Sequence, residues 1–180
     1  SKGCVLISQH ADSMGAPGAC ESKGVPNVSY NGSTFDACPE TFIISSAINW
    51  APYMLLISKA VCTKTAIPAD WCGGIPEGSV VLTGLNQNAA AKGTKEALDK
   101  AIAELKAGTL HVFDVTKDNY ITVDGKKLTS YMADVDTDEK FTADTEVIKD
   151  GYFAESAEGF RSAPYFNIKI DGIEYLNEQY

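Results

Sequence analysis

The clearest apolar pattern in the chain is the run FIISSAINWAPYMLLISKAV, residues 42–61. Its first half, Phe42–Ile48, is apolar and rich in β-branched side chains, which is typical of a buried strand. Its second half, Pro52–Val61, carries apolar residues at helical spacing and predicts a helix. Asn49 and Trp50 stand between the two halves. The pattern therefore predicts a strand-to-helix corner that carries an amide and a large aromatic ring.

Other apolar runs predict further strands at 4–8, 25–30, 79–85 and 109–113. A helix at 13–22 is expected to stop at Lys23-Gly24. A longer helix at 93–108 has an apolar stripe, with Thr94 as its expected cap and Glu96–Lys100 as its expected ion pair. Strands that alternate with helices indicate an α/β fold with a mainly parallel sheet.

Composition changes after residue 113. Residues 114–180 hold 15 of the 24 acidic residues of the chain but only 7 of its 15 basic residues, a formal charge of −8. The runs YITVDGKKLTS and YFNIKIDGIEYL each place Asp-Gly between alternating apolar positions, which is a strong hairpin signal. We therefore predict an α/β lobe at 1–113 and an acidic extension rich in β-hairpins at 114–180.

The formal net charge of −9 and the pI of about 4.6 oppose binding to nucleic acid or to anionic lipid surfaces. No apolar run reaches the roughly 18 to 20 residues of a membrane helix, and no signal peptide is visible. The chain opens on SKGCVLISQH, which leads straight into a predicted buried strand. We therefore expect a mature fragment, an excised domain or part of a longer chain.

Polar side chains follow three of the predicted strands. In an open parallel sheet, ligands bind beyond the carboxyl ends of the strands. Amides, hydroxyls and aromatic rings at such ends suit a neutral polar ligand, because amides both donate and accept hydrogen bonds. Ordinary helix capping and turn formation is the alternative interpretation. The residues at these strand ends are Gln9, His10, Asp12 and Ser13, then Tyr30, Asn31 and Ser33, then Asn49 and Trp50.

Motifs of catalysis and of metal binding are missing. The sequence has no G-x-S-x-G elbow, no H-E-x-x-H and no phosphate-binding loop, and His10 and His111 are its only histidines. The run DVDTDE at 134–139 resembles a calcium loop, but Glu139 stands where that loop needs glycine and Thr145 where it needs Glu. A solvated acidic loop is the better interpretation. We expect no catalytic residue, no cofactor and no metal site.

The cysteines form no CxxC pair, so zinc-ribbon spacing is absent. They number five, so at least one has no partner within the chain. Cys62 and Cys72 are close enough in sequence to form a disulfide in an oxidising compartment. The alternative is that the cysteines act as small buried hydrophobic residues.

The segments QHADS, GVPNVSYNGSTF and ISSAINWAPYMLLISKAV together resemble the basic-membrane-protein family of solute-binding lipoproteins, which includes purine-nucleoside receptors of bacterial ABC importers. The resemblance continues through WCGGIPEGSVVLTGLN, KAIAELKAGTLHVFD and the acidic tail. It covers most of this chain but only about the C-terminal half of a family protein, so the N-terminal lobe with its lipidated cysteine is largely absent.

The resemblance implies a type I periplasmic-binding-protein fold, in which two α/β lobes joined by crossover strands enclose the ligand. Segment 42–61 corresponds to the crossover strand and helix. The implied ligand is a purine base or nucleoside, and the implied partners are ABC permease subunits. Lacking its sheet neighbours, segment 42–61 is expected to favour dimers or swapping. The implied ligand-binding residues are Gln9, His10, Asp12, Tyr30, Asn31, Asn49 and Trp50.

Two positions, and the segment STFDACPE around Cys38, depart from the family pattern. Asn31 stands where many members carry an acid, and the loss of that carboxylate weakens any bidentate grip on a sugar diol. Ala51 replaces the glycine of the family's Asn-Trp-Gly-Pro corner. For Trp50, the alternative to a role in the cleft is a core anchor that packs against Tyr53.

The sequence therefore predicts a non-enzymatic, extracytoplasmic solute-binding component of an ABC importer, at the cell surface or in the periplasm. One alternative is an α/β enzyme that acts on nucleosides through His10 and Asp12. Another is a signalling sensor domain with the same fold.

Overall fold

The structure is a computed structural model that describes residues 3–116, 121–135, 140, 142–154 and 168–174. The chain forms two compact units, 1–107 and 108–180. The boundary expected from composition stood at 113/114. The two units are described separately below.

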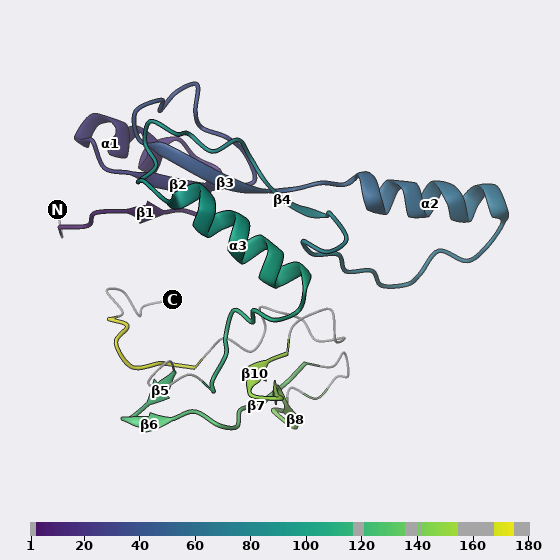
Figure 1. The fold of residues 1–180 in the computed structure, drawn as a ribbon. Coiled ribbons are helices and arrows are strands. Elements are labelled where there is room, and N and C mark those ends of the chain that lie inside the picture. Colours follow the sequence, from purple (N-terminus) through teal and green to yellow (C-terminus); the bar gives the residue numbers. More distant parts are fainter. Residues whose placement is uncertain (1–2, 117–120, 136–139, 141, 155–167, 175–180) are drawn as a thin grey trace. The chain divides into compact units, whose positions relative to one another are not determined.

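A four-stranded sheet organises the first unit (Figure 1). The strands run in the order β1-β2-β3-β4, with β1, β2 and β3 mutually parallel and β4 antiparallel to β3. This arrangement, with the helices that follow its strands, confirms a mixed α/β fold containing a mainly parallel sheet. The bounds are β1 Ile7–Ser8, β2 Asn27–Tyr30, β3 Phe42–Ile48 and β4 Val80–Leu82.

The helices described in the first unit lie close to their expected positions. They are α1 Gly15–Lys23, α2 Ala51–Thr63 and α3 Thr94–Lys106. Helix α1 ends at Gly24, whose φ of 65° is the left-handed cap that Lys23-Gly24 predicted. The expected Thr94 cap is wrong, because Gly93 is the N-cap and no side chain bonds the end of the helix.

The expected Glu96–Lys100 pair is also not the one formed. Among the described residues, the ion pairs on α3 are Lys95–Asp99 and Lys100–Glu104, both at i,i+4 spacing. Each lysine therefore pairs toward the C-terminal turn, and these exposed pairs contribute little to stability.

Two predicted strands differ most from the structure. The strand expected at 4–8 is shortened to Ile7–Ser8, because β1 lies at the sheet edge and Val5 is exposed. No strand forms at 109–113. There Phe113 packs on the apolar cluster of the second unit, and its carbonyl accepts the N–H of Phe153. The apolar pattern of 109–113 therefore reflects that cluster rather than the sheet.

Buried polar side chains fasten the sheet of the first unit to the turn before β3. The Asn27 Nδ2 donates to Thr41 Oγ1 at 3.0 Å, and that hydroxyl donates to Glu21 Oε2 at 2.6 Å. The Asn86 Nδ2 donates to the carbonyls of Pro39 and Phe42 at 2.7 and 2.8 Å. Because buried amides are costly unless paired, these bonds fix the start of β3.

Helix α2 follows the end of β3 and leaves much of its apolar surface uncovered. Met54, Leu55 and Val61 are 53, 70 and 65% exposed, and Ala60 is the one buried residue of this helix. No acidic residue occurs between Glu40 and Asp70, in contrast to the acidity of the chain as a whole. In the part of the chain that the structure describes, no helix is long and apolar enough to cross a membrane.

The second unit has an apolar cluster and short hairpins. The predicted hairpin at Asp124-Gly125 is confirmed, since both residues have positive φ and join β5 Thr122–Val123 to β6 Lys126–Lys127. The other strands pair as β7 with β8 and β9 with β10, with bounds Met132–Ala133, Thr145–Glu146, Ile148–Lys149 and Tyr152–Phe153. The cluster consists of Val115, Ile121, Ala133, Val135, Val147, Ile148 and Phe153.

The second predicted hairpin and the acidic loop lie partly outside the described residues. Within 168–174 there is a turn with Gly172 at φ 84° and no strand. The Asp171 carboxylate accepts the N–H groups of Asp124 and Gly125 at 3.1 and 2.9 Å, which clamps the first hairpin turn. Of the run 134–139, residues 136–139 lie outside the described part of the chain. Among the residues that are described, no group of three or more His, Cys, Asp or Glu side chains could hold a metal ion.

Glu146 links two hairpins of the second unit and gives it an acid-sensitive stability. Partial burial raises the pKa of this carboxyl, but bonds from Ser130 and from the N–H groups of Tyr131, Ile148 and Val147 outweigh burial and lower it. Because the pKa of this carboxyl is lower in the folded state, its contribution to stability is fully present at pH values above the unfolded-state pKa of about 4.3. The contribution is lost as the pH falls through the folded-state pKa.

We expect Glu146→Gln to flatten the acid limb of the stability curve below about pH 4.3, because the amide no longer titrates. Urea denaturation followed between pH 2 and 7 measures this limb. Glu174→Gln, at an exposed carboxylate of the same unit, is the matched control and keeps the wild-type limb. An unchanged acid limb in Glu146→Gln would contradict the assignment.

Candidate functional site

The carboxyl ends of β1, β2 and β3 meet at one edge of the sheet, since the three strands are parallel. These strands end at Ser8, Tyr30 and Ile48. The residues predicted to bind ligand are Tyr30 itself and residues that closely follow the three strand ends. The structure distributes all of them except His10 over two adjoining pockets of the first unit, and Tyr30 lines both.

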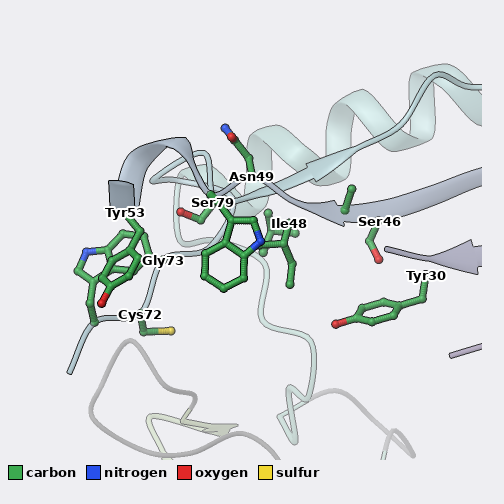
Figure 2. A pocket seen from close by; sticks show the side chains of 12 residues that line it. Tyr30, Ser46, Ile48, Asn49, Tyr53, Cys72, Gly73 and Ser79 are labelled. Atoms are coloured by element: carbon green, nitrogen blue, oxygen red, sulfur yellow. The ribbon is translucent and has the colours of Figure 1, made fainter. Parts of the chain in front are cut away.

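The first pocket is aromatic and has a volume of about 480 Å³. Figure 2 shows Tyr53 and Cys72 at one end of it and Tyr30 at the other. The Tyr53 and Trp71 rings stack with centroids 5.2 Å apart, and none of the described residues that line the pocket is charged. Its lining residues are Tyr30, Ser46, Ala47, Ile48, Asn49, Trp50, Tyr53, Trp71, Cys72, Gly73, Ser79 and Val80.

The second pocket is polar and smaller, about 280 Å³. Asp12 is its one charged lining residue. The Gln9 Nε2 donates weakly to the Ser13 carbonyl at 3.4 Å, while the Gln9 Oε1 is buried without a partner in the described part of the chain. The lining consists of Gln9, Ala11, Asp12, Ser13, Met14, Ser29, Tyr30, Asn31, Gly32, Ser33 and Thr34.

His10 supports the wall between the pockets. Its ring stacks on Tyr30 with centroids 4.5 Å apart and an interplanar angle of 22°. His10 itself lines neither pocket. Within the described residues, neither His10 nor Asp12 makes a side-chain hydrogen bond.

Asn49 holds the corner between β3 and α2 with three hydrogen bonds. Its N–H donates to the Ser79 carbonyl at 2.7 Å, and its Nδ2 donates to the Gly78 carbonyl at 3.0 Å. Its Oδ1 accepts the N–H of Ala51 at 3.1 Å, at the first turn of the helix. The amide is therefore used by the fold, in an Asx-turn that precedes the helix.

Trp50 is not a core anchor. Its side chain is 59% exposed, and Tyr53, the partner that the alternative interpretation assigned to it, stacks on Trp71 instead. Within the described residues the Trp50 ring stacks on no other ring. The interpretation of Trp50 as a core residue is wrong, and an aromatic face stands open at the pocket.

Sequence reasoning missed Tyr53, Trp71 and Ser79 as members of the site. The segment between α2 and β4 returns to the corner and brings Trp71 beside Tyr53. Gly73 permits this approach, because a Cβ there would lie 2.5 Å from Trp71 Cη2 and 2.7 Å from Ser79 Oγ. The available signal was that Trp50 and Trp71 are the only tryptophans of the chain.

Two of the five cysteines behave as the buried residues that the alternative interpretation expected, and none forms a disulfide. Cys20 and Cys38 are buried, and burial, with smaller contributions from Glu21 and Cys20, raises the pKa of the Cys38 thiol. Cys4, Cys62 and Cys72 are exposed and free, so the Cys62–Cys72 disulfide is not formed. Cys72 lines the aromatic pocket.

Neither the comparison with models of known protein families nor the comparison with curated proteins finds a match to this chain. The resemblance to the solute-binding lipoproteins therefore remains a prediction.

We expect Asn49→Ala to lower the free energy of unfolding by about 2 kcal/mol, since it removes two side-chain hydrogen bonds, one to the Gly78 carbonyl and one from the Ala51 N–H. Asn49→Asp keeps the acceptor for Ala51 but turns a carboxylate oxygen toward the Gly78 carbonyl, so this variant should also be less stable than the wild type. Urea denaturation of the three proteins measures both differences. Equal stability of all three would contradict the structural role of this amide.

Proposed function

We propose that this chain is the ligand-binding lobe of an extracytoplasmic solute-binding receptor for an ABC importer, and that its ligand is a purine base or nucleoside. The observation that carries the proposal is the pairing of an uncharged aromatic pocket with a polar pocket across Tyr30. A nucleoside has the same division, with a flat apolar base joined to a hydroxylated sugar.

The aromatic pocket offers ring faces to the base. Trp50, Tyr53 and Trp71 supply large apolar area at little cost in side-chain entropy, and stacked aromatic pairs gain further energy from their geometry. The polar pocket offers amide and hydroxyl groups to the sugar, with Gln9 Oε1 as an unused acceptor. The base then occupies the first pocket and the sugar the second.

The receptor assignment draws on the family resemblance, and two features of the first unit support it. The strand ends present their polar groups at one edge, where a second lobe of a type I periplasmic-binding-protein fold closes on ligand. Helix α2 exposes Met54, Leu55 and Val61, an apolar surface that packing against a further lobe would cover. In this proposal a lipid anchor holds the receptor at the membrane, and the closed form engages the permease.

Asn31 governs how the sugar is held. Its φ of 65° lies in the left-handed region, which asparagine and aspartate both tolerate. Its backbone N–H donates to the Ser46 carbonyl at 2.8 Å and locks the end of β2 to β3. An acid at this position therefore changes the chemistry of the polar pocket without straining the backbone.

We expect Asn31→Asp to tighten adenosine binding by about tenfold and to leave adenine binding unchanged, because a carboxylate accepts two hydroxyls of the ribose diol. Calorimetric titration of adenine, adenosine, guanosine and inosine into the wild type and the variant measures this ratio. Ser33→Asp adds the same charge to the same pocket and serves as the matched control.

Binding of none of these purines to this chain or to a version that includes the second lobe, in folded protein freed of carried-over ligand, would contradict the purine assignment. Equal changes for adenosine and adenine in Asn31→Asp would show that the sugar does not lie at the end of β2.

A further inference from the structure

The Ser79 side chain is a buried polar group with an unused hydrogen bond. Ser79 is 4% exposed, and its hydroxyl has no partner in the described part of the chain. Its backbone groups are both used, since its N–H donates to Gly74 and its carbonyl accepts from Asn49. Folded proteins leave few buried hydroxyls unpaired, because each costs roughly 1–3 kcal/mol. This hydroxyl lies among the lining residues of the aromatic pocket.

The surroundings of the hydroxyl are fixed by Gly73. The bare Cα of that glycine admits both the Ser79 Oγ and the rim of the Trp71 indole, each within 3 Å of the point where a Cβ would stand. The hydroxyl therefore lies beside the aromatic wall formed by Trp71 and Tyr53. When a flat ligand packs against this wall, a polar atom on the edge of the ligand is close to the Ser79 hydroxyl.

The charge of the pocket restricts the ligand. None of the lining residues is acidic or basic. A charged ligand would lose its hydration there without gaining a counter-charge, whereas a neutral ring loses little. The open face of Trp50 suits a flat molecule rather than a branched aliphatic one.

We propose that the aromatic pocket holds one neutral planar heterocycle and that Ser79 is the residue that selects it, by a hydrogen bond from its hydroxyl to the ligand's edge. The inference deepens the proposed function and rests on it for the choice of purines as probes. Because the hydroxyl is buried beside the Trp71 ring, the ligand reaches it by moving the edge of that ring.

The first experiment compares the wild type with Ser79→Ala and with Ser58→Ala, an exposed serine of α2 outside the pocket. Adenine and adenosine are titrated by calorimetry and by tryptophan fluorescence, which reports this pocket because both tryptophans line it. We expect Ser79→Ala to weaken binding by about tenfold and to leave the thermal midpoint unchanged or raised. Ser58→Ala should match the wild type. A purely structural Ser79 would lower the midpoint instead.

The second experiment needs no variant. Cys72 lines the pocket and is exposed, whereas Cys62 is exposed on α2 outside it. Alkylation of both thiols is followed by mass spectrometry, with and without saturating adenine. We expect adenine to slow the labelling of Cys72 at least tenfold and to leave Cys62 unaffected.

The outcomes separate this inference from the proposed function. If purines bind while Ser79→Ala binds them equally and Cys72 stays unprotected, the inference is overturned and the purine receptor stands. If purines do not bind but lumiflavin, another neutral planar heterocycle, protects Cys72 and depends on Ser79, the purine assignment fails and the inference stands. If neither probe binds and neither protects Cys72, both are overturned.

Discussion

The site depends on the three hydrogen bonds of Asn49. They tie the end of the central strand β3 to the start of α2 and to the residues that lead into β4. Together with the pairing of Ile48 and Val80 between β3 and β4, they place the residues before β4 beside Trp50, where these residues form the second wall of the aromatic pocket. The amide at this corner is therefore first a structural element, and the aromatic ring beside it is free to meet a ligand.

Different interactions stabilise the interior of each unit. In the first unit, paired polar groups around Asn27, Thr41 and Asn86 fasten the sheet, and much apolar surface on α2 stays uncovered. In the second unit, an apolar cluster supports short hairpins. Hydrogen bonds fix geometry but add little net stability, whereas apolar burial is the main favourable term in folding. The first unit is therefore well ordered at its strand ends while its helical surface stays available for packing.

The fold class and the central secondary-structure elements could be predicted from the sequence, because their patterns are local. The run at 42–48 is a strand with the bounds that its apolar pattern indicated, since β3 pairs along both of its edges. Asp124-Gly125 forms the predicted turn because few other residues accept positive φ at two successive positions. By contrast, the apolar run at 109–113 packs on a cluster built from distant residues, and a pattern within five residues cannot tell a strand from such packing.

The candidate site was predictable only where its residues follow strands directly. Gln9, Asp12, Tyr30 and Asn31 lie at strand ends, and a parallel sheet brings such ends together. Trp71 and Ser79 reach the pocket through a long connection, whose path is decided by Gly73 and by the bonds of Asn49. The spacing of residues in the sequence does not predict the course of this connection.

Tyr30 lines both pockets, and the ring of His10 braces it from behind. The Tyr30 side chain therefore lies between an apolar pocket and a polar pocket. A small molecule fits on one side of it, while a two-part molecule has to straddle it. In the proposed receptor, size discrimination at this edge of the sheet would depend on this one side chain, because Tyr30 is the described residue that both pockets share.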